Sequence, residues 1–346
     1  MLNDARSLRD PHHGMPGTRY AGDLQTVLRG PLGSDGAEHA RLRSVITPNL
    51  NADAVRRRAP KVQQVVHAVL DLLNGKGKAD LVGDFALPVA TTLTGDLVGI
   101  PADRRPRVME LMLVLSSAAH PLTPHMSAAR TELFRHLGDI ADHAERHPSD
   151  NIATSAVQGL ASGALVSRGE ALELLANAVF GALDSTVAAL TTGPLLLMLN
   201  PQAREHLLGS EQDAARTVEE VLRLAAPFPV SNHRFAAEAM EIGGQRVAGG
   251  DIVLFNLVSA NLDPAAWPRP EVLDPRRPAP ASHLSFGHGP HYCTGAALGR
   301  VTVRLALTEL FRRLPNLRAA TAVHEIPYRH GYVRHPESLP VRTTDP

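Results

Sequence analysis

The chain has 346 residues, of which 44% are hydrophobic, so it can bury a large core, which excludes disordered, collagen-like and disulfide-scaffold proteins. Lysine plus arginine equals aspartate plus glutamate at 35 each, which argues against a protein that binds nucleic acid through its phosphates. A single cysteine excludes an intrachain disulfide, and the start MLNDARSLRD lacks the layout of a signal peptide, so we expect a cytoplasmic protein.

Apolar residues recur at helical spacing from His39 to about Asn200, which predicts a mostly helical body. The predicted helices cover residues 38–48, 52–74, 87–98, 102–119, 125–147 and 168–199. Ser167 and Glu170 at the start of the last one have the spacing of a capping box, in which the serine accepts from a free backbone amide and the glutamate reaches back. Polar residues interrupt its apolar stretch, so we expect a buried core helix and no membrane span.

The second half of the chain continues with mixed elements and no linker, so a single domain is expected. The predicted elements are a helix at 211–224, short strands between 240 and 255, an irregular segment at 261–285, a helix at 294–313 and a closing hairpin at 332–342.

The single cysteine, Cys293, lies in a glycine-rich loop at residues 286–295. A lone cysteine is usually a small buried apolar residue. Here, however, a predicted helix begins directly after it, and the free amides and dipole of a helix N-terminus favour thiolate. The three glycines let the backbone approach something large and flat, against which Phe286 can pack. A thiolate with an open trans position is the ligand set of oxygen-activating haem enzymes, whereas a zinc site would need more ligands close by.

This loop resembles the cysteine-ligand signature of the cytochrome P450 family, Phe-Gly-x-Gly-x-His-x-Cys-x-Gly. The matching residues are Phe286, Gly287, Gly289, His291, Cys293 and Gly295. The resemblance implies a mainly α (α+β) fold, with a helical body, a small β-sheet region, and haem b (iron protoporphyrin IX) between two long helices with Cys293 as the iron ligand. It also implies an oxidoreductase of secondary metabolism, a monooxygenase that hydroxylates or epoxidises an apolar small molecule with dioxygen and electrons from ferredoxin and ferredoxin reductase.

The same resemblance assigns side chains to the two haem propionates. His39 and Arg43 match a His-x-x-x-Arg motif, Arg234 matches an arginine that follows a Glu-x-x-Arg helix, and His291 lies in the loop itself. Propionates are carboxylates at the edge of a buried macrocycle, and cationic donors offset the cost of removing them from water. Taken singly, each of these residues would be an ordinary surface or core residue.

Glu220 and Arg223 stand three apart on a predicted helix, a spacing that favours an ion pair. By itself such a pair is usually solvated and weak. The surrounding segment TVEEVLR is similar to the family's Glu-x-x-Arg helix, in which the pair is structural and anchors the irregular segment before the cysteine loop.

The long helix carries an acid and two hydroxyls, Asp184, Ser185 and Thr186, between apolar flanks. One interpretation is that a hydroxyl bonds back to its own helix while Asp184 turns to solvent, since a buried carboxylate is costly. The other follows from the resemblance, because the family has an acid–alcohol pair that relays protons for oxygen activation. The family's usual alcohol is threonine, so either Ser185 or Thr186 could serve here.

The substrate pocket is expected to be lined by the 10–37 loop, by Ala178, Gly181 and Ala182, and by residues 227–230. The arginines at 56–58 and 300–304 either dock an acidic ferredoxin or form ordinary solvated helix faces. Two rival functions stay open, a peroxide-driven oxygenase and a non-catalytic P450-like partner of a biosynthetic enzyme.

The segment Leu2–Arg6 resembles one that family members reach only after an initial helix and the first sheet strands. The resemblance covers essentially the whole chain from there. We therefore expect residues 1–346 to form a single P450-like domain that lacks those elements.

Overall fold

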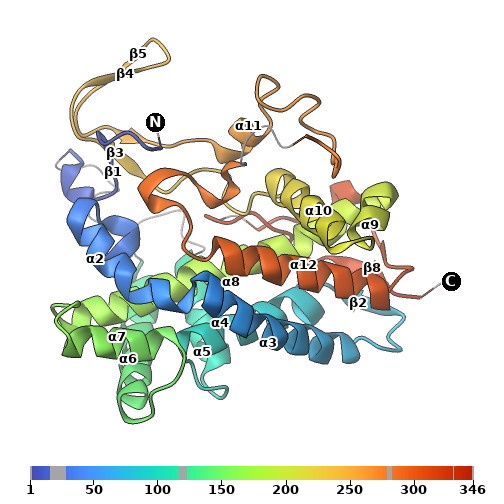
Figure 1. Ribbon diagram of the computed structural model, residues 1–346, viewed down its shortest axis with the longest axis horizontal. Coiled ribbons are helices and arrows are strands. Elements are labelled where there is room, and N and C mark those ends of the chain that lie inside the picture. The colour runs from blue at the N-terminus through green and yellow to red at the C-terminus, as the bar shows by residue number, and fades with distance from the viewer. Residues whose placement is uncertain (1, 16–28, 117–122, 279–282, 330, 345–346) are drawn as a thin grey trace.

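Helices form most of the part of the chain that the computed structural model describes, which is residues 2–15, 29–116, 123–278, 283–329 and 331–344 (Figure 1). The helices are α2 (Gly36–Ile46), α3 (Ala52–Asp71), α4 (Leu87–Val98), α5 (Arg105–Ser116), α6 (Pro124–Arg146), α7 (Ile152–Ala161), α8 (Arg168–Leu199), α9 (Pro201–Leu207), α10 (Glu211–Leu224), α11 (Leu257–Asn261) and α12 (Ala296–Arg313). The expectation of a mainly helical fold with small sheets is confirmed.

Helix α8 is the centre of the body, because α4, α5, α6, α7, α9, α10 and α12 all pack against it. Among the described residues it is long and apolar enough to cross a membrane, but 61% of its apolar window is buried inside the protein, as in a core helix. Ser167 caps it as predicted, accepting from the Glu170 amide at 3.2 Å. The Glu170 carboxylate accepts from the Val166 amide instead of from Ser167, so the predicted capping box is only half formed.

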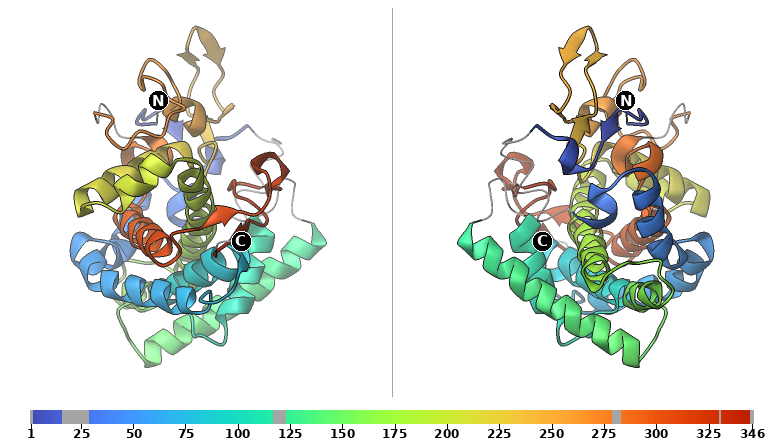
Figure 2. Two further views of the ribbon diagram at one scale, coloured as in Figure 1. Left: turned by 90° about the vertical axis from the view of Figure 1, so that its right-hand side faces the viewer. Right: turned by 90° about the vertical axis from the view of Figure 1, so that its left-hand side faces the viewer.

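The strands of the described residues are short and form three small sheets. Their orders are β1 (Ser7–Leu8)–β3 (Arg234–Ala236)–β6 (Ile252–Val253), β2 (Lys78–Asp80)–β8 (Pro340–Arg342)–β7 (Arg318–Ala319), and β4 (Met240–Ile242)–β5 (Gln245–Val247). The β4–β5 hairpin projects from the body in all views (Figures 1 and 2). It turns at Gly243 and Gly244, whose φ angles of 57° and 79° favour glycine.

The prediction of a closing hairpin at 332–342 is wrong. Strand β8 pairs with β7, which lies before the predicted hairpin, and with β2, which comes from a distant part of the sequence. This pairing buries Leu339 and Val341 completely, so the apolar pattern of the segment reports a sheet made by long-range contacts.

The helices predicted from the sequence also omit three that the structure contains. Helices α7, α9 and α11 were not predicted, because segments of ten, seven and five residues give too few turns for a clear period. The predicted helix at 102–119 corresponds to α5, and its last three predicted residues lie outside the described part of the chain.

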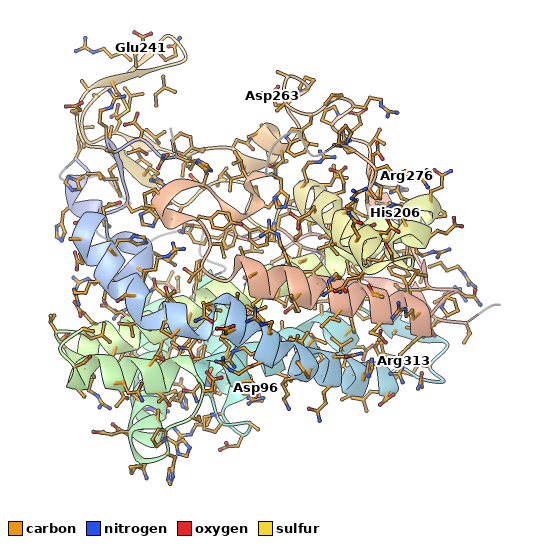
Figure 3. All side chains as sticks on the ribbon, in the orientation of Figure 1. Asp96, His206, Glu241, Asp263, Arg276 and Arg313 are labelled. Atoms are coloured by element: carbon orange, nitrogen blue, oxygen red, sulfur yellow. The ribbon has the colours of Figure 1, made fainter. Side chains whose placement is uncertain are left out.

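Charged side chains such as Glu241 and Arg313 lie on the outside of the molecule (Figure 3).

Candidate functional site

The cysteine loop runs through two short helical turns, η5 (Leu284–Phe286) and η6 (Gly289–His291), and ends where α12 begins. The Cys293 amide donates to the Phe286 carbonyl at 2.9 Å, which closes the loop. Gly289 has a φ of 79°, and a Cβ there would lie 3.0 Å from both Leu2 O and Asn3 Oδ1. Glycine at this position therefore allows both the turn and the close approach of the N-terminal segment.

The Cys293 side chain is exposed, yet burial raises the pKa of its thiol, an effect that a hydrogen bond from the Gly295 amide and the charges of Arg43 and Arg300 oppose. Both observations hold if the sulfur faces a cavity inside the protein. Gly181 on the central helix α8 is likewise exposed, and a Cβ there would meet no atom of the described residues within 4 Å. The structure thus leaves open space beside both the sulfur and the middle of α8.

These features fit haem, the prosthetic group that the loop motif implies. One thiol faces open space, and the described residues contain no group of three or more His, Cys, Asp or Glu side chains that could hold a metal ion. A metal ligated here by Cys293 alone would have to bring its other ligands with it, as iron in a macrocycle does.

The four residues assigned to the propionates are brought together. The rings of His39 and His291 lie 4.1 Å apart. Arg43 donates to Pro290 O at 2.8 Å, next to His291, and the charges of both Arg43 and Arg234 act on His39. Burial lowers the pKa of His291 to about 4, in spite of a hydrogen bond to the Asp35 carboxylate, 3.2 Å away.

Arg234 is 3% exposed and donates through Nη1 to Ser7 O at 2.9 Å, but its buried Nε has no hydrogen-bond partner among the described residues. Among the described residues, the carboxylate that acts on this cluster is Asp35, which also accepts from the backbone amides of Arg9 and Asp10. Asp35 was not predicted, because only the fold brings residue 35 next to residue 291. Two further carboxylates, such as those of haem, would suit the charge and the unused donor.

Glu220 and Arg223 form a buried bidentate ion pair, with N–O distances of 2.7 and 2.9 Å. Arg223 also donates to the carbonyl oxygens of Asn261, Pro270 and Val272, at 2.9, 2.6 and 3.1 Å. The Arg223 side chain is 0% exposed, so the interpretation of the pair as solvated and weak is wrong. The pair ties α10 to the irregular segment that precedes the cysteine loop.

Sequence reasoning missed Arg277, and it considered Arg300 for ferredoxin docking or a solvated helix face but not for this region. Arg277 donates to Glu220 at 3.3 Å. Arg300 on α12 forms a bidentate pair with Glu219 at 2.8 and 3.0 Å, donates to the Tyr292 hydroxyl at 3.0 Å and lies 4.5 Å from the centre of the Phe286 ring. The partners of Arg277 and Arg300 could not be predicted from the sequence, because only the fold brings these residues together.

The other arginines considered for ferredoxin docking are also paired. Arg56 pairs with Asp53, Arg57 and Arg58 share Asp150, and Arg304 lies 3.0 Å from Glu211. These contacts favour solvated helix faces over a free cationic patch.

Asp184 is 4% exposed, so the interpretation in which it turns to solvent is wrong. Its carboxylate accepts from Ser116 Oγ at 2.9 Å and from Arg329 Nη1 at 3.1 and 3.3 Å, and His335 Nε2 lies 3.5 Å away. Burial alone would raise the pKa of Asp184, but the interactions with His335, Arg329 and Ser116 outweigh it and hold that pKa below its usual value. All three partners come from outside α8.

Ser185 donates to the Gly181 carbonyl at 2.6 Å, so its hydroxyl bonds back to its own helix. Thr186 is half-buried. Of the expected pocket residues, Gly181 and Val230 are exposed and Ala178 and Ala182 are half-buried. Residues 16–28 of the expected 10–37 lining lie outside the described part of the chain.

Fold and site together define a mainly helical protein. Its one cysteine is exposed in the loop before a helix that packs on the central helix, and it lies near a cluster of arginine and histidine side chains. Comparison with known proteins identifies the family. The sequence profile described as Cytochrome P450 matches residues 214–340. The chain is 35% identical over 309 residues to "Cytochrome P450 165C4" of Amycolatopsis orientalis, an alignment covering 89% of this chain and 75% of that protein.

Two further relatives agree. Nocardicin C N-oxygenase of Nocardia uniformis is 33% identical over 348 residues, covering 99% of this chain and 86% of that protein. A solved structure of a cytochrome P450 enzyme for C–S bond formation in chuangxinmycin biosynthesis superimposes with a TM-score of 0.92 at 28% identity, covering 99% and 85% of the two chains. The chain belongs to the cytochrome P450 family, whose members are oxidoreductases, and the family implies a haem cofactor.

Proposed function

We propose that this protein binds haem b with Cys293 as the axial ligand and hydroxylates or epoxidises an apolar small molecule of secondary metabolism. The observation that carries the proposal is the Cys293 side chain, which is exposed although burial raises the pKa of its thiol. When bound, haem supplies dioxygen activation and oxygen-atom transfer, chemistry that no side chain provides. The relatives' names describe an N-oxygenase and a C–S bond-forming enzyme, so they support oxidative chemistry without fixing the substrate.

The chain's own residues would position the group. The Gly295 amide and the charges of Arg43 and Arg300 favour the thiolate form of Cys293. His39, Arg43, Arg234 and His291 would hold the propionates, since their side chains lie in one cluster. The open space beside Gly181 leaves room over α8 for an apolar substrate.

Proton delivery would fall to the acid and the hydroxyls of α8. Asp184 is held by Arg329 and Ser116, and Ser185 Oγ lies within hydrogen-bond distance of Gly181 O, whose neighbourhood is open. In the working enzyme, Ser185 or Thr186 would order a proton-donating water, and Asp184 would pass protons inward from the Arg329 side. We further propose a single domain, a cytoplasmic location, and reduction by ferredoxin and ferredoxin reductase.

The test is the spectrum of the reduced protein with carbon monoxide. The wild type should give the red-shifted Soret band of a thiolate-ligated haem, and Cys293→Ala should abolish it. Tyr292→Phe is the matched control, because it changes only the hydroxyl that Arg300 contacts and should keep the band. A red-shifted band in Cys293→Ala would refute the ligand assignment.

One observation favours peroxide-driven oxygenation as a second candidate. Both oxygens of Asp184 are within bonding distance of other side chains, and Ser185 is bonded to its own helix, so the groups for proton delivery are engaged. Peroxide already carries the electrons and protons that this route would supply. Product formed with hydrogen peroxide alone, faster than with ferredoxin and NAD(P)H, would support this alternative.

The third hypothesis, a non-catalytic partner of a biosynthetic enzyme, gains no support from the site, since Cys293 and its surroundings are present. A protein that purifies tightly bound to a partner and holds no haem would revive it.

A further inference from the structure

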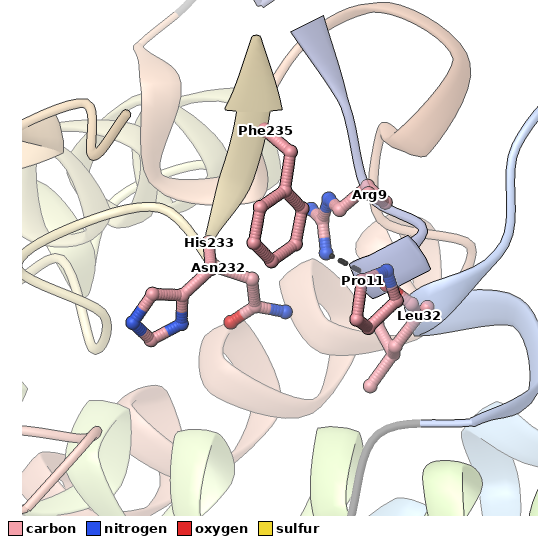
Figure 4. Close-up of a pocket in the computed structure, with 7 residues that line it drawn as sticks. Arg9, Pro11, Leu32, Asn232, His233 and Phe235 are labelled. Carbon is pink, nitrogen blue, oxygen red and sulfur yellow. Dashed lines mark hydrogen bonds between the residues drawn. The ribbon is translucent and has the colours of Figure 1, made fainter. Parts of the chain in front are cut away.

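Arg9 lies beside the side chains assigned to the propionates, His39, Arg43, Arg234 and His291, although no sequence motif pointed to it. It follows strand β1, whose Leu8 is paired with Phe235 of β3, so the next residue along β1 lies close to Arg234. The two arginines are near enough for the charge of Arg234 to lower the pKa of Arg9. Figure 4 shows the Arg9 guanidinium beside the Phe235 ring, in a small pocket that Asn232 and other residues line.

The Arg9 side chain makes one hydrogen bond to the described residues and leaves most of its N–H donors available. A guanidinium has five N–H donors. Nη1 donates to Leu32 O at 3.3 Å, while Nε is buried without a partner in the part of the chain that the structure describes. Asp35 accepts from the Arg9 backbone amide and not from its side chain.

The electrostatics of this arrangement are unfavourable for the protein alone. Burial comes first and Arg234 second among the causes that lower the pKa of Arg9 to about 9, so the side chain is still charged at neutral pH. Two neighbouring guanidinium groups, those of Arg9 and Arg234, each have a buried Nε that no described residue contacts by a hydrogen bond. A carboxylate between or beside them would satisfy both donors and offset the repulsion.

We propose that Arg9 is a further propionate-binding residue, which donates to a carboxylate of the haem from the N-terminal segment. The inference rests on the proposed haem site. The position favours the haem over a substrate carboxylate, because Arg9 acts electrostatically on His39 and His291, two of the side chains assigned to the propionates. Arg9 would thereby tie β1 and the N-terminal segment to the cofactor.

The test compares haem loss from the holoprotein carrying either haem or haem dimethyl ester, whose propionates are esterified and uncharged. Transfer of the haem to excess apomyoglobin reports the dissociation rate. Arg9→Gln should speed loss of ordinary haem by about 10- to 100-fold, the range expected for removing a hydrogen bond to a charged group. It should change loss of the dimethyl ester by less than about 3-fold, and Arg9→Lys should fall between the wild type and Arg9→Gln.

Arg6→Gln is the matched control, because Arg6 is in the same segment but exposed and paired with Asp4 at 2.8 Å. It should leave both dissociation rates unchanged. The reduction potential gives a second readout: Arg9→Gln should lower it, since a cation near the haem stabilises the state with less positive charge.

Equal acceleration for haem and its dimethyl ester would overturn the proposal and assign Arg9 a purely structural role. An unchanged rate of haem loss, combined with weaker binding of a fatty acid such as myristate, would overturn it in favour of a substrate carboxylate. In both cases the CO spectrum would still show thiolate-ligated haem. A wild-type protein that binds no haem would instead refute the proposed function.

Discussion

Asp184→Asn separates the structural role of this carboxylate from its proposed chemical role. The substitution keeps the size of the side chain and a polar contact to Ser116, but removes the charge that faces Arg329. Breaking a buried ion pair typically costs about 3–5 kcal/mol. Because Arg329 is 19% exposed and can recover some hydration, we expect about 2 kcal/mol, which corresponds to a fall of roughly 3 °C in the unfolding temperature of a chain of this size.

The assay is thermal unfolding at matched haem loading, since bound haem itself raises apparent stability. Turnover should fall by about 10- to 100-fold while substrate affinity is retained, the pattern of a group used after binding. Arg329→Met is the control: it should cost similar stability but keep most of the turnover, because the carboxylate remains. The double variant should be less destabilised than the sum of the two single variants.

The pH dependence follows from the direction of the Asp184 pKa shift. A carboxyl whose pKa is lower in the folded state stabilises the protein above its unfolded pKa, about 3.9, and that stability is lost as the pH falls through the folded pKa. The difference in unfolding free energy between wild type and Asp184→Asn should therefore shrink as the pH falls below about 4. Additive effects of the two substitutions, or a difference that does not shrink in acid, would refute this account.

Three further predictions concern the rest of the site. His39→Ala and Arg234→Ala should each speed haem loss, because both remove charge-assisted hydrogen bonds to the propionates, and unchanged haem occupancy in both would contradict the assignment. Ser185→Ala should divert reducing equivalents to peroxide, measured as product formed per NAD(P)H consumed; if Thr186 serves instead, only Thr186→Ala will do so. Glu220→Gln should cost about 3–5 kcal/mol of unfolding free energy, because it leaves buried Arg223 without its counter-charge.

The hydroxyl prediction and the Glu220 prediction can each be checked against a further set of variants. Full coupling in the Ser185→Ala, Thr186→Ala and double variants would show that neither hydroxyl takes part. For Glu220, the neighbouring Glu219→Gln is the matched control, because the Glu219 side chain is 43% exposed and its pair with Arg300 is partly solvated. Glu219→Gln should cost about 1 kcal/mol or less, and equal losses at the two positions would mean that burial does not set the strength of these pairs.

The sequence by itself determined the parts of this protein that depend on local pattern. The apolar period predicted most of the long helices, and the loop from Phe286 to Gly295 indicated the family, because glycine spacing, cysteine and the following helix are contiguous. The Glu220–Arg223 spacing likewise predicted an ion pair within one helix turn. Each of these signals lies within a few residues of chain.

The tertiary structure decided which side chains meet. Arg329 and Ser116 reach Asp184 from elements far away in sequence, so the choice between a solvent-facing and a buried carboxylate could not be made from α8 alone. Arg9 joins Arg234 only because β1 pairs with β3 across more than two hundred residues of chain. Charge balance inside a protein depends on such long-range contacts, and sequence periodicity carries no information about them.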